Sequence, residues 1–131
     1  HRYPLSPFAE KAAFGRARAL HEITINYPND AEALDEAWAG VMVFLRAYPN
    51  SVHAAEVTAM RDNLLQRKAD QSFAIANFYD RKAKKPAAAV ESYERFLEQF
   101  PRSDNTEVAR ERISLLADKV DKKKDASDEE N

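Results

Sequence analysis

Four aromatic–proline pairs divide the chain, and they constrain its fold more than any other feature of the sequence. Proline disfavours the helical conformation at the residue before it, so each pair predicts the end of a helix. A residue that can cap the next helix follows each pair, because its side-chain oxygen can accept hydrogen bonds from the free amides of a helix start. The pairs are Tyr3-Pro4, Tyr27-Pro28, Tyr48-Pro49 and Phe100-Pro101, and the candidate caps are Ser6, Asn29 or Asp30, Ser51, and Ser103 or Asp104.

Between these pairs, apolar residues recur at intervals of three and four, which is the period of an amphipathic helix. Alanine is the commonest residue and glycine occurs only twice, a composition that favours closely packed helices. We therefore expect an all-α fold of antiparallel helix hairpins, arranged as a right-handed superhelical array of about five helices. The expected helices cover residues 7–25, 30–47, 52–82, 87–100 and 104–120. The third has no strong breaker and can be one long helix or two with a kink near residues 68–71.

The composition changes near residue 118, after which almost every residue is charged or polar. Such a segment cannot bury enough apolar surface to offset its ordering entropy. We expect a helical repeat domain over residues 1–120 and a disordered tail over residues 121–131. The chain opens on His1, so we also expect it to be a segment of a longer protein.

Several function classes are disfavoured by what the sequence contains. The formal net charge is −2, and acidic and basic residues are interleaved, so no footprint for nucleic acid is present. Cysteine is absent, and His1, His21 and His53 form no metal-binding pair at helical spacing. No phosphate-binding glycine loop or nucleophile elbow occurs, and no stretch approaches the roughly 18 apolar residues of a membrane span. We expect a non-catalytic chain with no metal or cofactor.

A spaced motif in the second half resembles the tetratricopeptide repeat. It runs from Ile75-Ala76-x-x-Tyr79 through Ala89-x3-Tyr93 to Phe100-Pro101. In that repeat, small residues let two helices approach and aromatic residues fill the space beside them. A second copy begins at Phe14-Gly15 and departs from the pattern at Arg18 and Val41. The expected repeat-defining core residues are Gly15, Ala37, Trp38, Tyr48, Pro49, Ala76, Tyr79, Ala89, Tyr93 and Pro101.

Further stretches resemble BamD, a family of lipoproteins that assemble outer-membrane proteins in Gram-negative bacteria. They are the opening 2–8, the segment 45–51, and the series Arg61-Asp62-x-Leu64, Ala74-x-Ala76-x-Phe78-Tyr79 and Ala88-Ala89-Val90. The resemblance covers about residues 1–118 and corresponds to the C-terminal repeats of the family. The chain departs from it at Glu91-Ser92, where the family often has an arginine.

The resemblance implies a scaffold that docks onto the periplasmic POTRA region of the barrel insertase and meets unfolded outer-membrane proteins. It also implies a place at the periplasmic face of the outer membrane, held by a lipid anchor on an N-terminal region that this chain lacks. Two alternatives stay open: another periplasmic repeat adaptor, of the Tol-Pal coordinator type, and a generic peptide-binding repeat module.

Exposed side chains on the first helices of hairpins are the candidate partner contacts, since a repeat array binds through the surfaces that stacking leaves over. A basic run between two expected helices has two interpretations: cations favoured at a helix C-terminus, or a contact for an acidic partner or anionic lipid. The candidate partner-binding residues are Arg16, Arg18, Arg61, Gln66, Asn77, Arg81, Lys82, Lys84 and Lys85.

Overall fold

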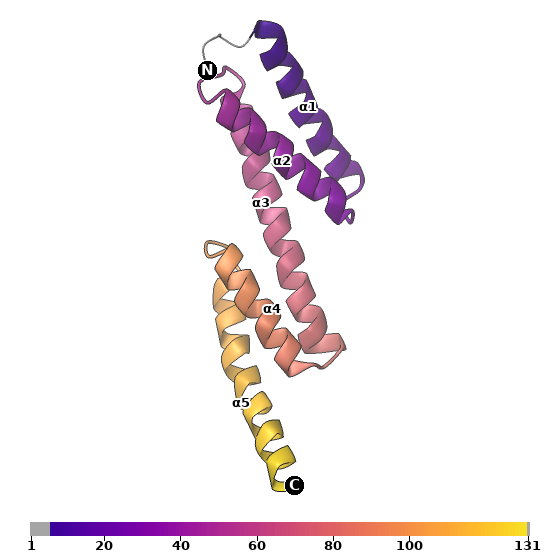
Figure 1. The fold of residues 1–131 in the computed structure, drawn as a ribbon, viewed down its shortest axis with the longest axis vertical. Helices are drawn as coiled ribbons and strands as arrows, with labels where there is room; N and C mark the ends of the chain where they lie inside the picture. The colour runs from indigo at the N-terminus through magenta and orange to yellow at the C-terminus, as the bar shows by residue number, and fades with distance from the viewer. Residues whose placement is uncertain (1–5, 131) are drawn as a thin grey trace. The chain divides into compact units, whose positions relative to one another are not determined.

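All regular elements of the described chain are helices (Figure 1). The structure is a computed structural model that describes the backbone of residues 6–130 and the side chains of residues 6–123. It has five α-helices and one π-helix, which confirms the all-α prediction; the handedness of the array stays a prediction. The elements are α1 (Pro7–Asn26), α2 (Ala31–Ala47), α3 (Ala54–Asn77), the π-helix η1 (Phe78–Lys82), α4 (Pro86–Gln99) and α5 (Thr106–Glu130).

Three of the aromatic–proline pairs form the same turn, and each ends a helix as predicted. Tyr27, Tyr48 and Phe100 are the C-caps of α1, α2 and α4, with φ of −126°, −131° and −131°. In each turn, the amide three residues after the aromatic residue donates back to the aromatic residue's carbonyl, at 3.1 to 3.2 Å. Proline disfavours the helical conformation at the residue before it, so one local rule produces all three turns. The pair Tyr3-Pro4 lies outside the described residues.

The predicted caps fall into two kinds. Ser6 accepts a hydrogen bond from the Ala9 amide at 3.1 Å, and Asp30 accepts one from the Ala33 amide at 3.0 Å, so both are N-caps. Ser51 and Ser103 instead accept from the amides two residues on, at 3.0 and 3.2 Å, within the turns that precede α3 and α5. Side chains therefore satisfy amides at each of these turns or helix starts.

Helices α3 and α5 are continuous at positions where the sequence allowed a kink or predicted an end. Residues 54–77 form one α-helix that passes directly into η1, with no break at residues 68–71. Helix α5 continues to Glu130, whereas the sequence predicted an end near residue 120 and a disordered tail. Lysine has high helix propensity, and Asp118 and Lys122 stand four residues apart, a spacing at which opposite charges support a helix.

The chain forms two compact units, residues 1–67 and 68–131, each with its own apolar core. The repeat domain expected over residues 1–120 stays a prediction. The core of the first unit comes from α1, α2 and the start of α3, and consists of Phe14, Ala17, Leu34, Ala37, Val41, Phe44, Val57, Met60 and Leu64. The core of the second unit consists of Ala69, Ala76, Ala89, Tyr93, Phe96, Ala109 and Leu116.

Most of the expected repeat-defining residues are buried or partly buried. Ala37, Ala76, Ala89 and Tyr93 are fully buried. Trp38, Tyr48 and Tyr79 are partly buried against the two cores. Pro49 and Pro101 are exposed in their turns, as residues that end helices need not be buried.

The expectation for Gly15 is wrong. Gly15 is exposed, and a Cβ atom at that position would meet no atom within 4 Å, so it permits no close approach of helices. The glycine that does so is Gly40 in α2, where a Cβ would lie 2.8 Å from Leu20 Cδ1 of α1. A buried small residue of α1 is Ala17, two positions after Gly15.

The same substitution should stabilise the fold more at Gly15 than at Gly40. Alanine is better than glycine in a helix by roughly 1 kcal/mol. We expect Gly15→Ala to raise the free energy of unfolding by about 0.5–1 kcal/mol, since nothing opposes the gain. Gly40→Ala should gain less, because Leu20 must be displaced. Urea unfolding followed by circular dichroism measures both, and an equal or larger gain for Gly40→Ala would contradict the close approach.

Candidate functional site

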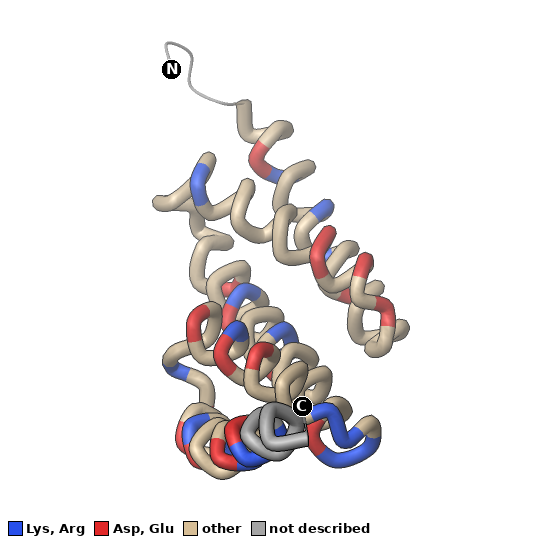
Figure 2. The backbone as a smooth tube through the Cα atoms, turned by 60° about the horizontal axis from the view of Figure 1, so that its bottom comes forward, with Lys and Arg blue, Asp and Glu red and all other residues tan. Residues whose placement is uncertain are grey.

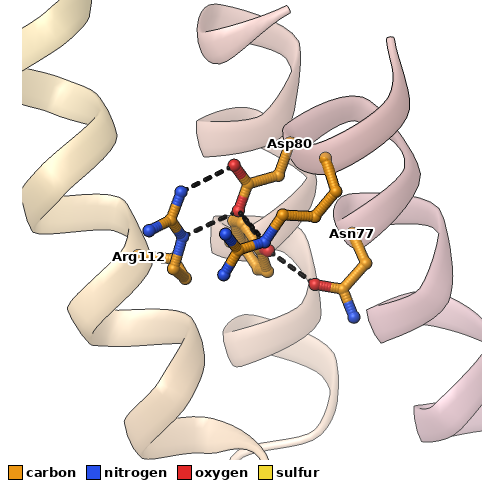
Figure 3. Close-up of polar contacts among 5 residues, drawn as sticks. Asn77, Asp80 and Arg112 are labelled. Carbon is orange, nitrogen blue, oxygen red and sulfur yellow. Dashed lines mark hydrogen bonds and ion pairs between the residues drawn. The ribbon is translucent and has the colours of Figure 1, made fainter. Parts of the chain in front are cut away.

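A buried carboxylate lies at the centre of the second unit. The side chain of Asp80, in η1, is only 1% exposed. The Arg112 guanidinium, from α5, donates two hydrogen bonds to it, from Nε to Oδ2 and from Nη2 to Oδ1, both at 2.8 Å (Figure 3). This two-pronged geometry is the strongest form of an arginine–carboxylate pair. It links η1 to α5 across the core.

Tyr93 of α4 brings the third helical element into the cluster. Its hydroxyl lies 2.8 Å from Asp80 Oδ2 and 2.8 Å from Asn77 Oδ1. A hydroxyl has one hydrogen, so it donates to one of these two oxygens at a time. Arg81 Nε stands farther away, 3.7 Å from Asp80 Oδ2, and its side chain is mostly exposed.

Helical spacing brings these polar groups together. Asp80 follows the buried Ala76 by four residues, and Tyr93 follows the buried Ala89 by four. Residues four apart share one face of a helix, so both polar groups point into the core. Arg112 occupies the same kind of position in α5, between the buried Ala109 and Leu116.

The environment moves the proton affinities of the cluster in opposite directions. The hydrogen bonds from Arg112 hold the pKa of Asp80 below its ordinary value, although burial opposes them. Burial, followed by the hydrogen bond to Asp80, raises the pKa of Tyr93 to about 12. The hydrogen bonds to Asp80 also raise the pKa of Arg112. At neutral pH the pair is therefore ionised and the phenol is neutral.

An open groove of about 520 Å³ lies on the surface above this cluster, and we call it the basic groove. Asp80 and Arg112 form part of its wall, between the η1–α4 connection and α5. Figure 2 shows that connection as a mostly blue stretch of tube. The lining residues are Asp80, Arg81, Lys84, Pro86, Arg112, Leu116, Lys119 and Lys123.

Lys84 adopts a left-handed backbone conformation, with φ of 53°. A non-glycine residue there costs roughly 1 kcal/mol or more, and glycine usually fills such positions after a helix. The conformation is fixed by the turn around it, in which the amides of Ala83 and Lys85 donate to the carbonyls of Phe78 and Tyr79, both at 2.9 Å.

The predicted partner-binding residues separate into four groups. Arg81 and Lys84 meet in the basic groove, whereas Lys82 and Lys85 are exposed but do not line it. Asn77 is partly buried against Tyr93. The remaining four belong to the first unit: Arg16, Arg18 and Gln66 are exposed, and Arg61 is partly buried and pairs with Asp62 at 3.1 Å.

Sequence reasoning missed the roles of Asp80, Arg112, Lys119 and Lys123. One signal was present: Arg112 stands in the apolar phase of its helix, and a charged residue there needs a buried partner. The first unit holds a second missed cluster, in which Arg67 donates to the hydroxyl and the carbonyl of the buried Thr24, both at 2.6 Å. That contact satisfies a carbonyl near the end of α1.

The described residues contain no group of three or more histidine, aspartate or glutamate side chains placed to hold a metal ion. None of the described helices is long and apolar enough to cross a membrane.

The buried phenol predicts a late step in the titration of the tyrosines. We expect one of the five tyrosines to ionise near pH 12, seen as a delayed absorbance change near 295 nm, as long as the fold persists. Because the unfolded phenol ionises near pH 10, the contribution of Tyr93 to the free energy of unfolding should fall as the pH rises from about 10 to 12. Tyr93→Phe should remove the late step, and a late step that survives the substitution would contradict the assignment.

Arg112→Met would leave the Asp80 carboxylate buried without its cation. We expect a loss of about 3–5 kcal/mol in the free energy of unfolding at pH 7. The additional change Asp80→Asn should recover part of this loss, because it removes the uncompensated charge. The measurement is urea unfolding of the wild type, both single variants and the double variant; losses that simply add would contradict a direct pairing.

The same pair predicts a pH dependence. The pKa of Asp80 is lowered in the folded state, so its stabilisation is complete above the unfolded value near 3.8 and is lost as pH falls through the lower folded value. The stability gap between the wild type and Arg112→Met should therefore narrow below about pH 4. A gap that stays constant down to pH 2 would contradict this.

Comparison with known proteins places the chain in a family. The comparison with curated proteins gives no match. The family model described as outer membrane lipoprotein, YfiO, matches residues 1–130. This match is consistent with the resemblance to BamD found in the sequence. Since it covers nearly the whole chain, the protein belongs to the YfiO outer membrane lipoprotein family.

Proposed function

We propose that this chain is a BamD-like, non-catalytic scaffold in outer-membrane protein assembly, and that it docks onto the POTRA region of the barrel insertase. The family match over residues 1–130 is the observation that carries the proposal. In the full-length protein, an N-terminal lipid anchor would hold the scaffold at the periplasmic face of the outer membrane, where unfolded outer-membrane proteins are its further partners. The match favours this role over a Tol-Pal coordinator type of adaptor or a generic peptide-binding module.

The surfaces left over by helix packing support a scaffold role. Large apolar side chains are exposed on both units, among them Val52 at 90% and Val43 at 60% in the first, and Phe78 at 52% and Ile75 at 50% in the second. These side chains are candidate contacts for a partner protein, whose binding would remove them from water.

The departure of the chain at Glu91-Ser92 narrows the proposed docking site. Ser92 is buried, and the exposed Glu91 pairs with Arg95 at 3.2 Å, so the stretch where the family often has an arginine presents a carboxylate instead. Arg95, three residues on, lines the same surface depression as Ser92, together with Ile75 and Gln99. We propose that Arg95 supplies the cation for POTRA docking in this chain.

A binding experiment with the POTRA region of the same organism tests both parts. The chain should bind it with micromolar affinity, and Arg95→Glu should weaken binding at least fivefold, because the substitution reverses a charge at the proposed contact. Arg102→Glu, an exposed charge reversal outside the depression, is the matched control and should leave affinity within twofold.

Absence of binding at micromolar concentrations would overturn the docking proposal. Binding that Arg95→Glu and Arg102→Glu weaken equally would overturn the assignment of Arg95 alone. The exposed candidates of the first unit are tested in the same assay with the double variant Arg16→Glu and Gln66→Glu. A loss confined to that variant would move the docking site to the first unit.

A further inference from the structure

We propose that the basic groove of the second unit binds an acidic segment of a partner protein. The groove combines five basic side chains with one carboxylate, on a chain whose net charge is −2. That carboxylate, Asp80, is already paired with Arg112 inside the cluster. The charges of Lys84, Lys119 and Lys123 therefore face the groove with little internal compensation, whereas Arg81 shares Asp80 at 3.7 Å.

No ion pair within residues 6–123 engages Lys84, Lys119 or Lys123. The acidic residues near them on α5 lie on other faces of the helix. Asp118 and Asp121 are one and two residues from Lys119, and neighbours at those spacings do not face each other. The groove thus holds a concentrated positive charge that the described part of the fold does not neutralise.

The arrangement of the charges favours a polypeptide over a compact anion. Arg112, Leu116, Lys119 and Lys123 follow one another at intervals of four, three and four, so they form one stripe along α5. The stripe rises about 16 Å, at 1.5 Å per residue. A single phosphate would reach one or two of these cations, whereas carboxylates three or four residues apart on a helix recur at matching distances of about 5–6 Å.

The hydrogen-bond donors available in the groove also favour dispersed carboxylates. Two of the five N–H groups of the Arg112 guanidinium are already bound to Asp80, which occupies one of its two bidentate edges. The lysines are point charges on flexible stems, and they suit dispersed carboxylates. Pro86 and the buried Leu116 give the groove an apolar floor for a side chain between those carboxylates.

Lys84 gives an independent indication. Its left-handed backbone would be less strained with glycine, yet the chain carries a lysine whose side chain lines the groove. A residue that costs the fold stability and places a cation in a recognition surface is consistent with a role in binding. The inference is separate from POTRA docking at Arg95, since Arg95 does not line the basic groove.

The test uses the full chain and a fluorescent helical peptide of about 16 residues, with glutamates three and four residues apart and one central leucine. Anisotropy titrations should show binding that weakens as salt rises. A peptide with glutamine in place of glutamate should bind at least tenfold more weakly. Lys119→Gln with Lys123→Gln should weaken the acidic peptide at least fivefold. Arg102→Gln with Arg110→Gln, which removes the same charge from exposed positions that do not line the groove, should change affinity less than twofold.

Lys84→Gly separates binding from folding. Glycine relieves the left-handed conformation, so the unfolding midpoint of this variant should equal or exceed that of the wild type. Its affinity for the acidic peptide should nevertheless fall two- to fivefold. Unchanged affinity would overturn the role of Lys84.

Three results would overturn the proposal as a whole. The first is equal loss of affinity in the groove variants and the matched control. The second is displacement of the peptide by inorganic phosphate below 1 mM, on the order of a specific phosphate site. The third is binding to phosphatidylglycerol vesicles through Lys119 and Lys123 with no binding of the peptide. If POTRA binding fails but the peptide results hold, the acidic-segment site in the basic groove is supported and only the proposed docking onto the POTRA region is overturned.

Discussion

Proline disfavours the helical conformation at the residue before it, and the hairpins of this chain depend on that constraint. Tyr27, Tyr48 and Phe100 each stop a helix in nearly the same backbone conformation. Each is followed by a turn closed by one hydrogen bond, from the amide three residues on. Such a turn sets both where a helix ends and where the next one begins. The apolar faces of successive helices can therefore meet only if their phase is correct relative to the turn, and the two cores show that it is.

The second unit adds a constraint of a different kind. A carboxylate that is 1% exposed is unfavourable unless its charge is balanced, and Asp80 is balanced by a residue 32 positions away in the chain. Hydrophobic contacts between α4 and α5 tolerate small shifts, whereas a two-pronged pair at 2.8 Å does not. The Tyr93 hydroxyl connects α4 to the same carboxylate. The polar cluster therefore specifies the register of η1, α4 and α5 more sharply than apolar packing alone would.

Features governed by local rules were predictable from the sequence, and features governed by distant contacts were not. The helix ends at Tyr27 and Tyr48 follow from the next residue alone. The Asp80–Arg112 pair requires knowing which helices pack together, and only the apolar phase of Arg112 hinted at it. Gly15 failed because a motif fixes spacing but not rotation about the helix axis, and Gly40 faces α1 instead. The positive φ of Lys84 was hidden because the local sequence gives no glycine to signal it.

The second unit uses basic residues in two ways, and burial separates them. Arg112 is 18% exposed and pairs with Asp80, so its charge is compensated within the fold. Lys119 and Lys123 follow it on the same stripe of α5 but lie beyond the core, where no buried acid meets them. When a helix extends beyond a packed core, residues at the same spacing continue along the same face. The stripe that is apolar and paired near Ala109 thus becomes a row of cations farther along, and the structural arginine positions the surface that the lysines present.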